Sequence, residues 1–394
     1  MNVIRTFHPV GQGAFYSERF YEDGETKAAY NIVYDCGVAW GNKKKSEHVI
    51  TQSFNNEDKI DYLFISHLDY DHISLVETLI SCVRHVNNIV LPFMVKDDVV
   101  ITMSLNKIAG YTGATVFLQR VIDSLNGNER GDNDTKITFV ADPEQPDYYN
   151  RNNRRSNGDI WGSGEVKSSG FKPDWIFIPF NVYNYSRKNL FIKSLEKLLV
   201  EQSFVQELDE IGYSSSLSSA DLYKLLKDTT FVEKVIKNRV LKNYFKRAYE
   251  KVEGGINVNS LLLYSGPDKV SDYRIMRSPF MIVSNYYYHP ILRRAGCLYT
   301  GDSDFELSIW KSKCNLSDVW DNIGTIQLPH HGSVNNFDFS TVIDKQYIFP
   351  VSCGSNNSYG HPSGKVLAFL ASNDCYPHII TENAETIYFQ VILG

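Results

Sequence analysis

Four short clusters of histidine and aspartate are the residues of this chain whose types and spacing could do chemistry. In chain order they are His67-Leu68-Asp69-Tyr70-Asp71-His72, Thr300-Gly301-Asp302, Pro329-His330-His331-Gly332 and Gly360-His361-Pro362. Each cluster stands where a strand is expected to run into a loop. Neutral imidazoles and carboxylates both bind divalent cations, and two cations about 3.5–4 Å apart can hold a bridging hydroxide at neutral pH. The sequence therefore predicts a two-metal hydrolytic centre.

The first cluster is the most informative of the four. It directly follows residues 60–65, an almost wholly apolar run typical of a strand that is buried on both faces. The cluster is then a loop at the carboxyl end of a strand, where α/β folds place their ligand sites. Alternate residues of an extended loop point the same way, so His67, Asp69 and Asp71 should converge while His72 turns to a second ion. A polar surface loop is the alternative, but ionisable groups directly after a buried run cost free energy unless they bind something.

The elements that must position these clusters are strands at both ends of the chain. Extended patterns cover residues 2–7, 29–34, 60–65 and 88–92, and again 259–264, 280–283, 296–300, 324–328, 347–351 and 386–393, with a helix over 363–371. Gly11-Gln12-Gly13 is interpreted as a tight turn rather than a phosphate-binding loop, because no helix and no lysine follow it. Helical spacing follows the strand at 60–65, so the start of the domain is expected to alternate strand and helix.

The middle of the chain has a different pattern. Residues 93–255 are interpreted as an insertion of loops and helices within one domain that spans residues 1–394. Residues 126–170 are rich in turn formers, residues 175–182 predict a strand, and two helices are expected afterwards. The second of these helices covers residues 222–240, with Ser218 or Ser219 as its cap.

Composition limits the classes of protein that remain. Hydrophobic residues make up 43% and aromatic residues 13% of the chain, which suffices for a large core. The net charge of −6 leaves no overall basic surface for nucleic acid, so any such contact must be local. The N-terminal residues lack a signal-peptide pattern, no run is long enough to span a membrane, and the six cysteines lack metal-site spacing. We expect a soluble cytoplasmic protein without membrane contacts.

Further short motifs accompany the four clusters, and together they resemble a known family. They are Val10-Gly11-Gln12-Gly13, Asp35-Cys36-Gly37, Asn259-Ser260-Leu261 and the run Gly354-Ser355-Asn356-Asn357-Ser358-Tyr359. Taken in order, the motifs resemble the metallo-β-lactamase superfamily, and more closely the hydrolase domain of ComEC-type competence proteins and their free-standing relatives. The resemblance omits the middle of the chain. It implies an α/β fold, a four-layer αβ/βα sandwich of two mixed sheets with helices outside.

The resemblance also implies the ligands of two divalent metal ions, zinc or manganese. The implied metal ligands are His67, Asp69, Asp71, His72, Asp302, His330 and His361. Asp69 replaces the histidine that is commoner in the superfamily, and the resulting harder ligand set favours manganese without excluding zinc. The usual third histidine has no clear counterpart, because His85 is interpreted as structural and His289 as a pocket-lining residue.

Adjacent His330 and His331 leave one assignment open. On an extended backbone their rings point to opposite sides, so only one is expected to bind an ion. We expect His330 to be that ligand and His331 to orient another ligand or to donate to a substrate oxyanion, with the reverse assignment remaining open. Asp71 and His331 are the expected catalytic residues.

Residues that orient ligands or contact substrate are expected around the ions. Asp35 is expected to orient a ligand histidine, and Ser333 and Asn357 to contact substrate, with local turns as the alternative for all three. Lys234, Lys237 and Lys242 belong to a basic strip interleaved with aromatic residues, which could follow a phosphate backbone. A solvated helix face is the alternative account of this strip, and of Arg151, Arg154 and Arg155.

These features predict an enzyme, a metal-dependent hydrolase. A phosphodiesterase or nuclease that uses a hydroxide bridging two ions is expected, with nucleic acid or a nucleotide-type phosphodiester as its substrate. This choice of substrate comes from the resemblance rather than from particular residues. A hydrolase of a thioester or lactone is one alternative, and a non-catalytic metal-binding sensor protein is another.

Overall fold

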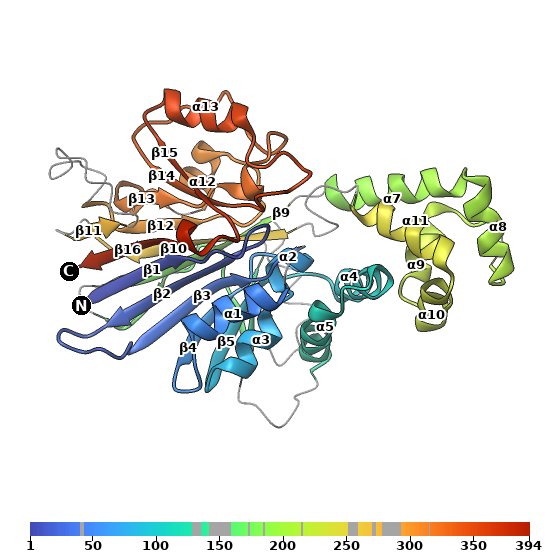
Figure 1. Ribbon diagram of the computed structural model, residues 1–394, viewed down its shortest axis with the longest axis horizontal. Helices are drawn as coiled ribbons and strands as arrows, with labels where there is room; N and C mark the ends of the chain where they lie inside the picture. Colours follow the sequence, from blue (N-terminus) through green and yellow to red (C-terminus); the bar gives the residue numbers. More distant parts are fainter. Residues whose placement is uncertain are drawn as a thin grey trace.

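The computed structural model describes residues 1–39, 43–127, 135–141, 159–171, 174–183, 186–213, 216–250, 259–269, 273–277, 293–314 and 316–394. Within these residues, two mixed sheets pack face to face and helices cover both outer surfaces (Figure 1). This arrangement confirms the predicted fold class, a metallo-β-lactamase-like α/β sandwich. None of the helices in these ranges combines the length and the apolar character needed to cross a membrane.

The first sheet is built from both ends of the chain. Its strands are β1 (Asn2–Phe7), β2 (Phe15–Tyr21), β3 (Tyr30–Cys36), β4 (Lys59–Phe64), β5 (His85–Pro92), β6 (Lys136–Val140), β7 (Asp159–Trp161), β11 (Arg274–Arg277) and β16 (Tyr388–Leu393). They lie in the order β11-β16-β1-β2-β3-β4-β5-β6-β7. Strands β3 to β7 are parallel to one another, as expected where helices connect successive strands.

The second sheet is mostly C-terminal. Its strands are β8 (Lys167–Ser168), β9 (Trp175–Tyr183), β10 (Asn259–Pro267), β12 (Gly296–Tyr299), β13 (Ile323–Ile326), β14 (Ile348–Ser352) and β15 (Tyr376–Ile380). They lie in the order β15-β14-β13-β12-β10-β9-β8. The strands from β12 to β15 are parallel, so the loops that follow β12 and β13 leave the sheet at the same edge. The predicted strand at 280–283 lies outside the described residues.

An aromatic layer fills the space between the sheets. Phe7, Tyr16, Phe64, Phe177 and Tyr299 are all buried there. Side chains of this size remove large apolar areas from water, and this burial is the main force that holds the sheets together.

The same layer contains a buried ion pair. Arg5 Nε donates to Glu18 Oε1 at 2.6 Å, and both side chains are fully buried. The rest of the guanidinium is satisfied by the carbonyls of Ala295 and Ser265 and by Gln390 Oε1. A buried charge pair is tolerated when hydrogen bonds satisfy its polar atoms, and each guanidinium nitrogen of Arg5 has a partner here.

Helices cover the outer face of each sheet. One apolar core joins the first sheet to α1 (Lys43–Ser53), α3 (Val76–Cys82), α4 (Lys96–Ala109) and α5 (Thr112–Leu125), and a short helix α2 (Tyr70–Ile73) follows β4. A second core joins the other sheet to α12 (Leu307–Lys313) and α13 (Gly364–Ser372). Three 3-10 turns, Trp320–Asn322, Pro329–Gly332 and Ala384–Thr386, complete the described elements of this part.

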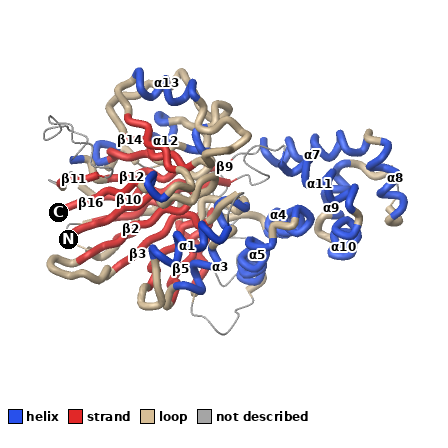
Figure 2. The backbone as a smooth tube through the Cα atoms, viewed as in Figure 1, coloured by secondary structure: helices blue, strands red, loops and turns tan. Residues whose placement is uncertain are grey.

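The remaining helices form a unit of their own beside the sandwich. They are α7 (Ser186–Leu199), α8 (Gln202–Glu210), α9 (Ser219–Leu225), α10 (Thr229–Lys237) and α11 (Arg239–Glu250). Figure 2 shows them extending to one side, beyond α4. We call α4 and α7 to α11 the helical unit. Helix α4 serves both parts, because Val99 and Met103 pack on the first sheet while Ile101, Leu105 and Ile108 pack in the core of the helical unit.

The prediction of a single helix over residues 222–240 is wrong, because three helices, α9, α10 and α11, cover this region. Asp228 and Asn238 divide it, because their side chains accept hydrogen bonds from the first amides of α10 and α11. Ser218 caps α9 as predicted. Within the proposed insertion 93–255, strands β6 to β9 belong to the two sheets, and the elements described outside the sandwich are helices.

Candidate metal centre

Loops that follow β4, β12 and β13 bring the predicted clusters together. Ser66 and His67 follow β4 of the first sheet after one residue, Ile65, whereas Asp302, His330 and His331 follow β12 and β13 of the second. The two sheets are joined at this point, because the Leu261 amide of β10 donates to the Ser66 carbonyl at 2.8 Å. The centre therefore lies where strand ends of both sheets meet.

The first ligand group surrounds one carboxylate oxygen of Asp302. Asp302 Oδ2 lies 3.6 Å from His67 Nε2 and 3.7 Å from His330 Nε2. His67 Nε2 also lies 3.4 Å from Asp69 Oδ2. His67 thus lies close to Asp69 and Asp302, and His330 lies close to the same oxygen of Asp302; ligand atoms of His67, Asp302 and His72 are all within 4.8 Å of one another.

The second ligand group surrounds the other oxygen of Asp302. Asp302 Oδ1 lies 3.3 Å from His72 Nε2. Asp71 Oδ2 lies 3.1 Å from His331 Nε2 and 3.9 Å from His72 Nε2. Asp302 thus stands between the two groups and presents one oxygen to each, as a residue that bridges two ions would.

Each histidine is held by its Nδ1 atom, which leaves Nε2 for the centre. His72 Nδ1 donates to Asp35 Oδ2 at 2.8 Å, and His67 Nδ1 contacts Ser66 Oγ at 2.8 Å. In the other sheet's loops, the bonds run from His330 Nδ1 to Asn336 Oδ1 at 2.6 Å and from His331 Nδ1 to the Ser352 carbonyl at 2.8 Å. This pattern is typical of metal-binding histidines, because a partner on one nitrogen fixes the ring and its tautomer.

Buried polar atoms support the same conclusion. Nε2 of His67 and Nε2 of His72 are inaccessible to water and make no hydrogen bond within the described residues. Ligand atoms on neighbouring corners of a tetrahedral site, bound at about 2.0–2.2 Å, are roughly 3.3–3.6 Å apart, close to the distances in both groups. The residues present therefore fit the binding of divalent metal.

The charges of the centre depend strongly on one another. Burial favours neutral carboxyl groups, but the neighbouring imidazoles outweigh it and hold the pKa of Asp302 well below its usual range and that of Asp71 at about 2. Burial likewise disfavours a charged His72, yet the carboxylates of Asp302, Asp35 and Asp71 raise its pKa well above the usual value. Without an ion the carboxylates are compensated by protons on histidine, and a cation would replace those protons.

Two glycines allow the backbone to pack tightly behind the ligands. A Cβ atom on Gly37 would lie 2.4 Å from the Asp71 carbonyl oxygen, and one on Gly301 would lie 2.6 Å from Ser66 Cβ. Gly301 also has a φ of 54°, which favours glycine. Both positions therefore require glycine for reasons of space.

The prediction for His330 and His331 rested on an extended backbone, which is wrong. Both residues have left-handed φ angles, 47° and 52°, inside the 3-10 turn Pro329–Gly332. The turn directs both rings to Asp302 and Asp71, so each ligand group receives one of them. His331 lies in a group with Asp71 and His72 that could hold a metal ion.

His361 lies beside the two groups and in neither of them. Its ring centroid is 5.8 Å from that of His330 and 6.4 Å from that of His331. Asn357 holds its loop by accepting from the His361 amide at 3.0 Å and donating to the Gly354 carbonyl at 2.7 Å. Ser333 accepts from the Asn335 amide at 3.2 Å and closes the turn after His331. The described contacts of Asn357 and Ser333 therefore fit the turn alternative.

The three lysines named for the predicted basic strip lie on two helices, α10 and α11. Lys234 donates to the Ile211 carbonyl at 2.8 Å and packs over Tyr213, within the helical unit. Lys237 is exposed at the end of α10, whereas Lys242 lies on α11 next to Gly110. His85 begins β5 and pairs with Lys59 at the start of β4, so it lies at the opposite end of that strand from His67. His289 and the arginines 151, 154 and 155 lie outside the described residues.

Sequence reasoning missed three residues that support the centre. Ser66 donates from Oγ to Asp35 at 2.7 Å and contacts His67, and its place directly before the first cluster was a usable signal. Asn336 and Tyr249 carried no such signal. The Tyr249 hydroxyl lies 3.4 Å from Asp69 Oδ1, and its pKa is raised well above the usual value by burial and by the nearby carboxylates, so the phenol stays neutral.

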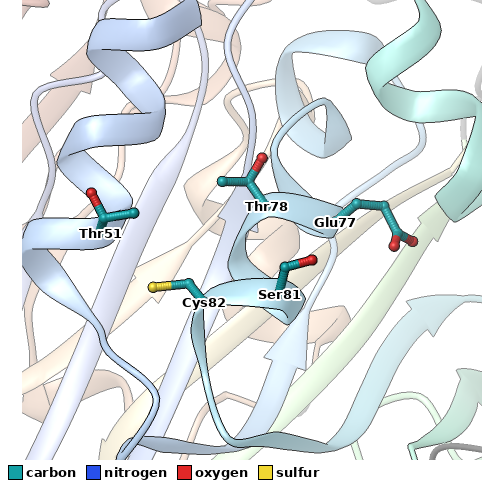
Figure 3. Close-up of a pocket in the computed structure, with 5 residues that line it drawn as sticks. All are labelled: Thr51, Glu77, Thr78, Ser81 and Cys82. Atoms are coloured by element: carbon teal, nitrogen blue, oxygen red, sulfur yellow. The ribbon is translucent and has the colours of Figure 1, made fainter.

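A surface pocket lies between α1 and α3, away from the ligand groups. Thr51, Glu77, Thr78, Ser81 and Cys82 line it (Figure 3). Its charged residue, Glu77, is paired with Arg120 at 2.8 Å, and the Cys82 thiol donates to a backbone carbonyl. The pocket therefore shows no group set up for chemistry.

Comparison with known proteins supports the superfamily. Residues 26–81 match the family model described as the metallo-beta-lactamase superfamily. The matched segment contains Asp35 and the whole first cluster, His67 to His72. No curated protein matches the chain. The match and the ligand groups together support a metal-dependent hydrolase.

Proposed function

We propose that this protein is a phosphodiesterase that uses two divalent metal ions, with nucleic acid or a nucleotide derivative as its substrate. The observation that carries the proposal is the position of Asp302, whose two oxygens face the two ligand groups at 3.3 and 3.6 Å. Two bound ions would lower the pKa of a water molecule and neutralise charge on the phosphoryl oxygens.

The residues of the chain hold and orient that centre. Asp71, His72 and His331 would hold one ion, and His67, Asp69 and His330 the other, with Asp302 shared. Asp35 and Asn336 keep the rings of His72 and His330 turned so that Nε2 faces the ions. In this proposal Asp71 and His331 contribute to catalysis as ligands.

A phosphodiester is favoured over a thioester or lactone by the surroundings of the centre. Tyr70, between Asp69 and Asp71, packs against Tyr111 with ring centroids 4.6 Å apart. Lys246 of α11 lies over the other ring, 5.6 Å from the Tyr111 centroid. Both rings pack in or against the core of the helical unit, so the cation of Lys246 is the feature that suits an anionic substrate. A carbonyl substrate has no need of this charge.

Turnover and metal content test the proposal together. After loading with manganese or zinc and dialysis, elemental analysis should find two equivalents of metal per chain. The loaded protein should hydrolyse bis(p-nitrophenyl) phosphate, and Asp71→Ala and His72→Ala should abolish turnover with the fold retained. Faster cleavage of a thioester than of the phosphodiester would favour the carbonyl alternative. Bound metal without turnover of either substrate would favour a sensor protein.

Binding of an oligonucleotide tests the substrate class. Lys242→Glu with Lys246→Glu should weaken binding and reduce the salt dependence, because fewer counterions are released in each complex. Lys237→Glu, on the exposed end of α10, is the matched charge reversal and should have a smaller effect. Hydrolysis of the small chromogenic ester should survive all three changes. Unchanged oligonucleotide binding in the double variant would remove the support for a nucleic-acid substrate.

A further inference from the structure

The helical unit reaches the metal centre through one side chain of α11. Tyr249 is buried near the end of this helix, and its hydroxyl lies 3.4 Å from Asp69 Oδ1. The two residues are 180 positions apart in the sequence. All the candidate ligands come from loops, the short helix α2 and a 3-10 turn of the sandwich, so this contact joins a separate structural unit to the centre.

The two oxygens of Asp69 face different partners. Oδ1 faces the Tyr249 hydroxyl, whereas Oδ2 faces His67 Nε2 at 3.4 Å, within the first ligand group. A carboxylate on a loop can rotate about its Cβ–Cγ bond, and a donor on one oxygen restricts that rotation. We propose that Tyr249 is a positioning residue that holds Asp69 in the orientation required to bind a metal ion.

Tyr249 is itself held in place by the packing of the helical unit. It lies in the same buried core as Phe245 and Ala248 of α11. We call residues 67–72 the metal loop. Its residue Tyr70, next to Asp69, packs against this core as well as against the core of the first sheet. The helical unit thus contacts the metal loop at two consecutive residues, Asp69 and Tyr70. Metal affinity at the first ligand group consequently depends on α11.

The inference rests on the proposed function in one respect, the role of Asp69 as a ligand. The test is the metal affinity of Tyr249→Phe, measured by titration of the metal-free protein with manganese and with zinc in competition with a chelator. Loss of a group that orients a metal ligand weakens binding by about 10- to 100-fold. We expect a loss in this range for one of the two ions and little change for the other.

Tyr244→Phe is the matched control, because it removes a hydroxyl from the same helix. The Tyr244 hydroxyl pairs with Ser203 of α8, inside the helical unit. This variant should bind both ions as the unchanged protein does. The stability of metal-free Tyr249→Phe should also match that of metal-free Tyr244→Phe, since a merely structural role would lower stability without ions and leave affinity unchanged.

Asp69→Asn separates the positioning role of Tyr249 from the proposed function, in which Asp69 is a metal ligand. If Asp69→Asn weakens metal binding and Tyr249→Phe does not, the inference is wrong and the proposed function stands. If the unchanged protein binds no metal, the proposed function fails first. If both variants weaken the same ion and the double variant is no weaker than Asp69→Asn alone, the two residues act as one unit, as proposed.

Discussion

Replacing Asp35 by asparagine tests how the centre holds His72. Asp35 Oδ1 accepts a hydrogen bond from the Ser66 amide at 2.7 Å. Asp35 Oδ2 accepts hydrogen bonds from Ser66 Oγ at 2.7 Å and from His72 Nδ1 at 2.8 Å. Asparagine keeps the shape and can keep the Oδ1 acceptor, but it places an NH₂ donor where Oδ2 stood. His72 Nδ1 can bond to this NH₂ group only as an acceptor, which favours the tautomer with its proton on Nε2. A protonated Nε2 cannot bind a metal ion.

The size of the effect follows from this change of tautomer. Mutation of a group that supports a metal-binding histidine costs about 10- to 100-fold in metal affinity. This range corresponds to about 1.4–2.8 kcal/mol. Because asparagine reverses the tautomer rather than only loosening the ring, we expect the upper end, about 100-fold for the ion held by Asp71, His72 and His331.

The assay is competition between the metal-free protein and a fluorescent chelator for zinc. Asp61→Asn is the matched control, since Asp61 is a buried carboxylate of the same sheet that accepts the Asn31 amide at 3.0 Å. Circular dichroism should show that both variants are folded. Affinity of Asp35→Asn within threefold of the unchanged protein, or an equal loss in Asp61→Asn, would refute this account of His72.

Three further predictions follow from the buried groups. Metal binding should release protons and should tighten as pH rises toward the pKa of His72, because Asp302, Asp35 and Asp71 outweigh burial and keep the metal-free ring protonated. Calorimetry in phosphate and in Tris at one pH should therefore give different heats of binding, and equal heats would count against proton release. Glu18→Gln should lower the free energy of unfolding in urea by about 3–5 kcal/mol, because it leaves Arg5 buried without its counter-charge, whereas exposed Glu22→Gln should change it by less than about 0.5 kcal/mol. Gly37→Ala should abolish metal binding, since its Cβ would lie 2.4 Å from the Asp71 carbonyl; Gly364→Ala, with no atom within 4 Å, should bind normally.

Local patterns in the sequence predicted the fold well where burial is regular. The apolar run before His67 became β4, and the strand predicted at 175–182 became β9. Strand β2 (Phe15–Tyr21) was not among the predicted strands. Its Glu18 is buried by pairing with Arg5 of β1, and no local pattern reveals a charge whose partner lies on another strand.

For the candidate site, the sequence indicated residues but not the turns that orient them. His67 and His72 of the first cluster lie near Asp302, because strand ends bring them to one edge. The left-handed turn at His330 and His331 could not be foreseen, since histidine rarely adopts that conformation and tertiary contacts impose it. Tyr249 escaped notice because its role depends on how the helical unit packs beside the sandwich, which no spacing in the sequence encodes.

The most direct test of the two-metal centre is anomalous diffraction from crystals grown with manganese or zinc. The account predicts two anomalous peaks about 3.5–4 Å apart, one among His67, Asp69 and His330 and the other among Asp71, His72 and His331, with Asp302 between them. A single peak, or peaks that avoid Asp302, would contradict it.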